Sequence, residues 1–395
     1  MIASSRTIIH SARLVTSGAV TEDGWVIFDG GMIVATGAGA FPRLAATGDP
    51  SGSGDAPKTT VIDAAGSWLT PGFIDIHCHG GGGNAFDDGA DAISTSLALH
   101  RSHGTTRSVL SLVTAPMSDL EARLEVIATL TERDPMVLGA HLEGPFLAPS
   151  HHGAHDPQLL RSPDNASTSR LLEAGNGQLR QITIAPELPG GMVALRQFVD
   201  AGVAVAVGHT GSNYAQARAA FDAGASIRTH AFNAMPGLHH REPGPVAAAI
   251  HTAEVILEVI NDGVHVHPDI VRIAFASAPE RIALITDAMA AAGSHDGQYL
   301  LGSRSVTVSN GVARLTDARS IAGSTLTMDG ALRGAVIDVG LPMAVAVLAL
   351  TETPARAIGR EADLGSLAPG YAADAVLLDT ELTVTQVWAG GVRLR

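Results

Sequence analysis

The sequence predicts an α/β protein: a (β/α)8 TIM-like barrel with a small β-sandwich domain built from both chain ends. Two observations lead to this prediction. The middle of the chain alternates continuous apolar runs with helical stretches rich in Ala, Leu and Arg, whereas both ends carry short β-branched segments separated by turns. The length of 395 residues also suits a barrel of about 250 residues with a smaller appended domain.

Residues 1–66 are expected to form the first part of the sandwich. They contain three β-branched segments separated by Gly-Gly and other turn residues, a pattern typical of hairpins: 6–15, 24–37 and 59–66. Residues 47–58 are rich in Gly, Pro and Ser, and we expect them to form an exposed loop.

Residues 67–365 are expected to form the barrel. A strand that is apolar along its whole length is typical of a sheet covered on both faces, which requires parallel strands joined by crossover helices. Eight such units are needed to close the barrel. The chain carries eight runs of this kind, at 72–77, 105–113, 136–142, 181–186, 203–208, 225–230, 254–260 and 281–286.

Two segments near the C-terminus depart from the alternation. Residues 298–316 are expected to form a hairpin inserted near the last barrel unit, with Asn310-Gly311 as its turn. After helical segments near 327–360, residues 366–395 return to strands. We expect these strands to pair with those of the N-terminal part and complete the sandwich.

The composition limits the partners and the compartment. A formal net charge of −14, from 25 basic and 39 acidic residues, disfavours nucleic acid and anionic membrane surfaces as partners. No apolar run reaches the ~18 residues of a membrane span, and the first residues lack the continuous apolar stretch of a signal peptide. The single cysteine, Cys78, allows no intrachain disulfide and suits a reducing compartment. We therefore expect a cytoplasmic protein that acts on a small molecule.

Histidines and carboxylates follow six of the eight apolar runs. Because the carboxyl ends of the strands form one rim of such a barrel, where active sites are assembled, these side chains are expected to converge on one pocket. They are His77, His79, Glu143, His209, His230, His265 and Asp287.

His77 and His79 form a His-x-His pair at the end of the first run. Side chains alternate between the faces of a strand, so both imidazoles point to the same side and can share a metal ion. Cys78 points to the opposite side, and we interpret it as a small buried apolar contact and not as a ligand.

Glu143, His209 and His230 provide one carboxylate and two imidazoles from three different strand ends. This combination suits Zn²⁺ or Fe²⁺ and leaves coordination positions open for water. Ligand types alone do not distinguish these ions from Mn²⁺. We therefore predict a site for one or two divalent ions per subunit.

Asp287 is the candidate acid/base. A carboxylate beside a divalent cation can accept a proton from water whose pKa the cation lowers towards ~7, and can later pass it to a departing amine. The alternative interpretation of Asp287 is an N-cap for residues 287–293.

Longer stretches of the sequence resemble the amidohydrolase superfamily and, within it, the N-acetylglucosamine-6-phosphate deacetylases. HLEGPF, GAHDP and THAFNAM are specific to the deacetylases, whereas the His-x-His pair and the closing segment GSLAPGYAADAVLLD (365–379) belong to the whole superfamily. The matching segments follow one another along nearly the whole chain: PGFIDIHCHG (71–80), HLEGPF (141–146), GAHDP (153–157), GHT (208–210), THAFNAMPG (229–237), REPG (241–244), NDGVH (261–265), TDAM (286–289) and AGSTLTMD (322–329).

The resemblance implies deacetylation of N-acetyl-D-glucosamine 6-phosphate to D-glucosamine 6-phosphate and acetate, in amino-sugar catabolism and cell-wall recycling. It implies metal ligation by Glu143, His209 and His230, with Asp287 as acid/base and His265 polarising the acetyl carbonyl. Members that keep both histidines of the His-x-His pair can bind two ions. It further implies a homodimer, in which Arg241 meets the phosphate across the interface as a bidentate guanidinium partner. The substrate contacts implied are His155, Asn233, the Ala234 backbone, Arg241 and His265.

Other functions stay open at this point. Cyclic amidases of the superfamily bridge two metals with a carboxylated lysine on a barrel strand, but the only lysine is Lys58, ahead of the barrel. Glu143 must then supply any bridging carboxylate. Another deacetylase or a deaminase of the superfamily needs no lysine and is the main enzymatic alternative. A non-catalytic scaffold predicts lost ligands, whereas all the expected ones are present.

Overall fold

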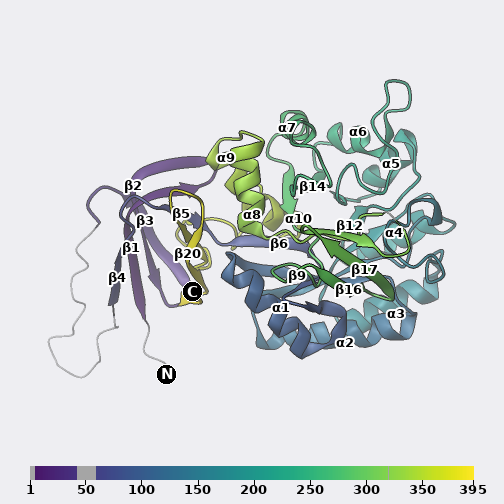
Figure 1. The fold of residues 1–395 in the computed structure, drawn as a ribbon, viewed down its shortest axis with the longest axis horizontal. Coiled ribbons are helices and arrows are strands. Elements are labelled where there is room, and N and C mark those ends of the chain that lie inside the picture. Colours follow the sequence, from purple (N-terminus) through teal and green to yellow (C-terminus); the bar gives the residue numbers. More distant parts are fainter. Residues whose placement is uncertain (1–4, 42–58, 319) are drawn as a thin grey trace.

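The fold is given by a computed structural model that describes residues 5–41, 59–318 and 320–395. A barrel forms the larger part, and a smaller sheet made of strands from both ends of the sequence lies at one side of it (Figure 1). The exposed loop predicted for residues 47–58 lies outside the described residues.

Eight parallel strands form the barrel, as the sequence predicted. All residues of the strands at 105–113, 137–143 and 256–260 are buried, which explains why these runs are apolar almost throughout. The first and last strands lie against each other, and the Asp287 backbone N–H donates to the His77 carbonyl (2.8 Å) just beyond their ends. The strands are β6 (Phe73–Cys78), β9 (Thr105–Val113), β10 (Val137–Glu143), β11 (Leu179–Ile184), β12 (Ala204–Val207), β13 (Ile227–Arg228), β14 (Ile256–Ile260) and β15 (Ile282–Ile285).

Helices surround the barrel and bury their apolar faces against its strands (Figure 1). Side chains that accept backbone N–H groups define where two of them begin: Asp164 caps α3 and Asn213 caps α5. The α-helices are α1 (Ala90–Ser102), α2 (Met117–Arg133), α3 (Asn165–Gly175), α4 (Gly191–Asp200), α5 (Tyr214–Asp222), α6 (Gly244–Ile250), α7 (Pro268–Ser277), α8 (Met328–Arg333), α9 (Met343–Leu348) and α10 (Glu352–Ala357). Short elements complete the part: β7 (Gly80–Gly81), β8 (Asn84–Ala85), η1 (Phe86–Asp88), η2 (Pro149–His151) and η3 (Gly334–Asp338).

The two chain ends share one sheet of eight strands, so the predicted pairing of the ends is confirmed. β5 and β19 join them by antiparallel pairing, with Leu69 opposite Leu377, around a core that includes Phe28 and Trp388. The strands are β1 (Arg6–Thr16), β2 (Ala19–Asp29), β3 (Met32–Ala38), β4 (Thr59–Asp63), β5 (Trp68–Pro71), β19 (Ala375–Leu378), β20 (Val384–Ala389) and β21 (Val392–Arg393). The domain division at residues 66 and 365 stays a prediction; β5 lies beyond the first boundary and still pairs with this sheet.

The insertion near 298–316 is a small antiparallel sheet of three strands, one more than a hairpin: β16 (Gly297–Leu301), β17 (Arg304–Ser309) and β18 (Val312–Leu315). Asn310 and Gly311 form the predicted turn, with φ of 51° and 72°. In Figure 1 this sheet crosses the face of the barrel. It therefore lies where it can form part of a wall around the barrel's rim.

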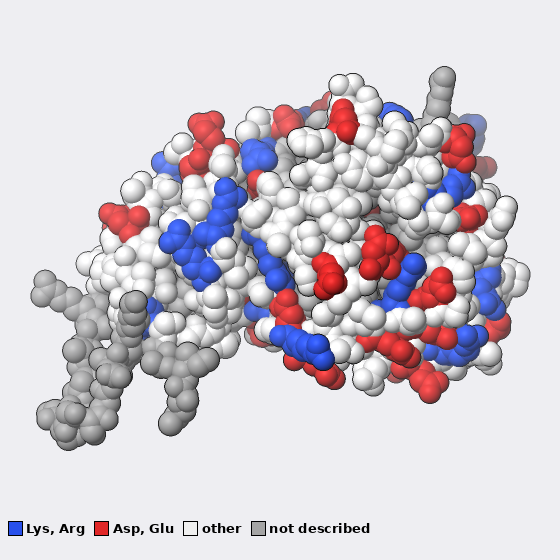
Figure 2. Space-filling model, turned by 60° about the horizontal axis from the view of Figure 1, so that its bottom comes forward, with Lys and Arg blue, Asp and Glu red and all other residues white. Residues whose placement is uncertain are grey.

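The surface agrees with the acidic composition. On the face in Figure 2, acidic and basic side chains are interspersed over the barrel, and among the described residues no basic patch extends across it. Of the helices formed by the described residues, none combines the length and the apolar character that crossing a bilayer requires.

Candidate active site

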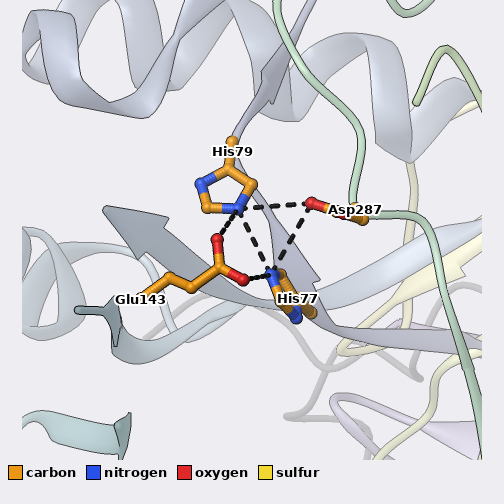
Figure 3. A group of neighbouring side chains, drawn as sticks. All are labelled: His77, His79, Glu143 and Asp287. Atoms are coloured by element: carbon orange, nitrogen blue, oxygen red, sulfur yellow. Dashed lines mark hydrogen bonds and ion pairs between the residues drawn. The ribbon is translucent and has the colours of Figure 1, made fainter. Parts of the chain in front are cut away.

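A first group of four buried side chains meets at the barrel's rim: His77, His79, Glu143 and Asp287 (Figure 3). The Nε2 atoms of His77 and His79 lie 3.2 Å apart, so the two imidazoles of the pair do point to the same side. His79 Nε2 is 3.1 Å from Glu143 Oε2 and 3.3 Å from Asp287 Oδ1. His77 lies on β6 and His79 directly follows it, the glutamate ends β10, and the aspartate follows β15.

The second group shares Glu143 with the first. Its Oε1 atom lies 3.1 Å from His209 Nε2 and 2.9 Å from His230 Nε2, and these two nitrogens are 3.0 Å apart. Oε2 faces His79 and also His155, whose Nε2 is 3.2 Å away. The carboxylate thus lies between the imidazoles of both groups: Oε2 faces His79 and His155, and Oε1 faces His209 and His230, with His77 Nε2 also nearest to it at 3.4 Å. This is the position that a bridging ligand would occupy.

The two groups fit divalent cations. Two ligands on one tetrahedral ion, each about 2.0–2.1 Å from it, are about 3.3 Å apart. The 3.0–3.2 Å separations between imidazole nitrogens are close to this value. A cation at these positions would compensate the negative charge of the buried carboxylates that the imidazoles surround. The same donor set, nitrogens with a carboxylate, is the one that Zn²⁺ and Fe²⁺ prefer.

The site also attracts positive charge. Burial disfavours the charged imidazolium of His79, but hydrogen bonds to Asp287 and Glu143 outweigh it and raise its pKa to about 10. Burial would raise the pKa of Asp287, yet the neighbouring His77 and His79 lower it to about 2. The Asp287 carboxyl is therefore ionised at neutral pH, as a proton acceptor must be.

Backbone strain concentrates on residues of this site. His209, His230 and Asp287 have φ of 45°, 23° and 47°, in the region that non-glycine residues rarely adopt. Such conformations cost free energy and occur mainly where the surrounding structure needs a side chain in one place. They also explain why β13 ends at Arg228, earlier than the apolar run predicted: the chain turns at His230 to direct its ring at Glu143.

A cavity of about 260 Å³ opens over both groups and receives four of the five predicted substrate residues. His155, Asn233, Ala234 and His265 all line it. The sequence analysis assigned no site role to the other wall residues, although three of them lie in the matching segments 153–157 and 322–329. They offer small or apolar side chains and backbone groups: Gly153, Ala154, Leu301, Ser320, Ile321 and Gly323. Gly153 (φ 58°) must be glycine because a Cβ would lie 2.9 Å from the His209 ring.

The pKa values of His265 and His155 are shifted in opposite directions. Burial lowers the pKa of His265, but the hydrogen bond and charge of Asp262, whose Oδ2 is 2.7 Å from Nδ1, raise it above its ordinary value overall. Asp262 thus favours the protonated ring, and in that form Nε2 of His265 carries an N–H that can be donated into the cavity. Burial lowers the pKa of His155 to about 4, so this ring is neutral at pH 7.

Arg241, the fifth predicted substrate residue, does not line the cavity of its own chain. It is exposed, on the loop between β13 and α6, with its Nη1 atom 2.8 Å from His240 Nε2. The predicted phosphate contact therefore requires another copy of the chain or a movement of this loop.

Cys78 lies outside both groups of candidate ligands. Its thiol is buried, with Sγ 3.4 Å from His100 Nε2. Burial and the charge of Asp75 raise the pKa of this thiol to about 12, so it carries no thiolate charge at neutral pH.

Two buried polar residues below the rim were missed by the sequence analysis. Glu258, on β14, contacts His77 Nδ1 at 3.0 Å. His141, two residues before Glu143, is held between Ser111 and Thr183. The available signal was a polar residue inside an apolar run, at the position whose side chain faces the barrel's interior.

Comparison with known proteins points to the same chemistry. The sequence model of the Amidohydrolase family matches residues 68–394 of this chain. The N-acetylgalactosamine-6-phosphate deacetylase of Escherichia coli O157:H7 is 41% identical over 84% of this chain and 89% of its own length. The N-acetylglucosamine-6-phosphate deacetylase of Vibrio furnissii is 35% identical over 82% of each chain. A mutant N-acetyl-D-glucosamine-6-phosphate deacetylase of Mycobacterium smegmatis, solved with N-acetyl-D-glucosamine 6-phosphate, superimposes with a TM-score of 0.90 at 42% identity, covering 99% of both chains.

Proposed function

This chain belongs to the amidohydrolase family, and on that premise we propose that it deacetylates N-acetyl-D-glucosamine 6-phosphate to D-glucosamine 6-phosphate and acetate. The observation that carries the proposal is the position of Glu143 between two sets of imidazoles, with Asp287 beside them and a cavity above. The deacetylases that resemble the chain over most of its length support the reaction class and the substrate. The role proposed is in amino-sugar catabolism and cell-wall recycling.

The proposed cofactor is one or two divalent cations per subunit, Zn²⁺ or Fe²⁺. His77, His79 and Asp287 would hold one ion, His209 and His230 the other, with Glu143 between them. When bound, such a cation lowers the pKa of water and polarises the amide carbonyl.

The protein side chains then have two tasks. Asp287 accepts a proton from the attacking water and later delivers it to the amine nitrogen as the C–N bond breaks, so that acetate and a free amine leave. His265, oriented by Asp262, donates a hydrogen bond to the oxygen on which negative charge develops. His155, Asn233 and the Ala234 backbone line the cavity where the sugar would lie.

Arg241 is proposed as the phosphate ligand, acting in a second copy of the chain. Its exposure on a loop away from its own cavity supports an intersubunit contact and hence a homodimer. A guanidinium is the suitable partner, because a chain with a net charge of −14 otherwise repels a phosphate. We also propose a cytoplasmic location, which a single unpaired thiol suits.

A second candidate substrate is N-acetyl-D-galactosamine 6-phosphate, the 4-epimer. The specific observation in its favour is the relative from Escherichia coli O157:H7 at 41% identity, named for that substrate. Both substrates carry the same acetamide and phosphate, so the groups assigned above serve either one. A deaminase has no comparable support, because the relatives compared above act as deacetylases by name.

The test is acetate release across a panel: the 6-phosphates of N-acetylglucosamine, N-acetylgalactosamine and N-acetylmannosamine, and the unphosphorylated sugars. We expect the highest kcat/KM with N-acetylglucosamine 6-phosphate and little turnover without phosphate. A higher kcat/KM with the galactosamine epimer would replace the first candidate by the second. No acetate from any member, by protein shown to contain metal, would refute both.

A further inference from the structure

Glu258 is a fully buried carboxylate in the middle of the barrel, outside the cavity described above. It lies on β14 with its side chain directed into the barrel's interior. One oxygen, Oε2, is 3.0 Å from His77 Nδ1 and accepts the His230 backbone N–H at 3.3 Å. The other, Oε1, accepts the Gln181 side-chain amide at 2.7 Å. A single carboxylate thus joins β6, β11 and the end of β13.

These hydrogen bonds determine which nitrogen of the His77 ring carries a proton. Both oxygens of Glu258 accept N–H groups, from Gln181 and from the His230 backbone, so in the contact with His77 the carboxylate is again the acceptor and Nδ1 is the donor. Nε2 is then left with its lone pair directed at His79 and Glu143, 3.2 and 3.4 Å away. In metal sites, a carboxylate on the far nitrogen fixes the tautomer and the orientation of a ligating imidazole and raises its basicity.

The other histidines of the site are held differently. His209 Nδ1 lies 2.9 Å from the His151 backbone carbonyl. The Nδ1 atoms of His79 and His230 are buried and have no partner among the described residues. Of the imidazoles that face Glu143, only that of His77 has a carboxylate on its far nitrogen in the described part of the chain.

From this geometry we propose that Glu258 is a positioning residue that makes the His77–His79 side of the centre competent to bind its own cation. It acts through His77 and touches neither substrate nor the reacting atoms. The inference rests on the metal centre of the proposed function. It adds the identity of the residue that allows a second ion to bind. Loss of Glu258 should therefore weaken the binding of the ion at His77 and His79, whereas the ion at His209 and His230 should stay bound.

The experiment measures Zn²⁺ binding to metal-free full-length protein, by calorimetric titration and by elemental analysis after dialysis. For Glu258→Leu we expect the site at His77 and His79 to lose about 10- to 100-fold in affinity for Zn²⁺, so that dialysed protein retains one ion and not two. Glu258→Gln keeps an acceptor for His77 Nδ1–H without the charge, and should fall between Glu258→Leu and the wild type.

The matched control is Glu187→Gln. Glu187 accepts hydrogen bonds from Thr210 Oγ1 and the Gly211 backbone N–H, both at 2.6 Å, and is also close to the rim. It does not contact His77, so its variant should keep two ions. Thermal melting of each metal-free variant separates a folding defect from a binding defect.

Two ions bound equally well by Glu258→Leu, equal weakening of both sites, or a wild-type protein that takes up one ion only would each overturn the proposal. None of these readouts requires turnover, so a chain without deacetylase activity would refute the proposed function and leave this inference standing.

Discussion

The Nε2 atoms of His209 and His230 lie 3.0 Å apart, and both approach the same oxygen of Glu143. These residues follow Glu143 by 66 and 87 positions, just beyond the ends of two different barrel strands. Nothing in the local sequence brings them together. The parallel barrel does so, because it places every strand's carboxyl end on one rim.

Replacing Asp287 by Asn should remove the proton acceptor and leave the shape of the site nearly unchanged. General acid–base catalysis typically contributes about 10²–10⁴-fold, so we expect kcat for acetate release to fall by at least that factor. Elemental analysis of the variant should still find metal, because Glu143 and the histidines remain. Turnover at the wild-type rate would exclude Asp287 from proton transfer.

Removing the metal should lower stability as well as activity. An ion that binds only the folded state stabilises it by about 4 kcal/mol when its free concentration is 1,000 times the Kd. We therefore expect a chelator to lower the melting temperature and added Zn²⁺ to restore it. The control is Glu143→Gln, which lacks the shared ligand and should melt at the same temperature with and without chelator. An unchanged melting temperature of the wild type after proven metal loss would contradict a metal held by these residues.

The sequence predicted the position of a side chain correctly where a single rule of strand or barrel geometry determines that position. The alternation of side chains predicted that His77 and His79 point to one side, and the rim predicted that Glu143 meets His209 and His230. The eight barrel strands followed from continuous apolar runs, because both faces of such a sheet are covered.

The remainder depends on contacts that no local pattern encodes. Leu301 reaches the cavity because the inserted sheet folds over the rim, and Gly323 contributes backbone only. In the sequence, Glu258 is one acidic residue in an apolar run. Its contact with His77 becomes apparent only when β6 and β14 are placed in the same barrel. The third strand of the insertion and the extension of the end sheet to Trp68–Pro71 were missed for the same reason: short segments pair according to their neighbours in space.

Arg241→Ala should weaken binding of the phosphorylated substrate and spare the chemical step. A hydrogen-bonded charge pair contributes about 1.5–3 kcal/mol, so KM should rise about 10- to 100-fold with kcat little changed. Turnover of unphosphorylated N-acetylglucosamine should not respond. Arg218→Ala is the matched control, since Arg218 is another surface arginine and pairs with Asp222 on α5. Equal losses with and without phosphate would show that Arg241 is not a phosphate ligand.

Asp329 makes stability depend on pH in the acid range. Burial alone would raise the pKa of this carboxyl, but hydrogen bonds with His103 and Thr327, together with the charge of Arg333, hold it below its ordinary value. A carboxyl whose pKa is lower in the folded state adds stability that is complete above the unfolded pKa of ~3.9 and disappears as pH falls through the folded value. Asp329→Asn should therefore cost about 1–3 kcal/mol at pH 7.

The same linkage fixes how this cost varies with pH. The difference in melting temperature between wild type and Asp329→Asn should persist down to about pH 5 and shrink below about pH 4, where the wild-type carboxyl also loses its charge on unfolding. Asp317→Asn is a suitable control, because its carboxylate pairs with Arg304 at an exposed position and such pairs contribute little. A difference that grows as the pH falls would contradict the assigned direction of the pKa shift, because protonation of Asp329 would then stabilise the fold, as it does for a carboxyl whose pKa is raised.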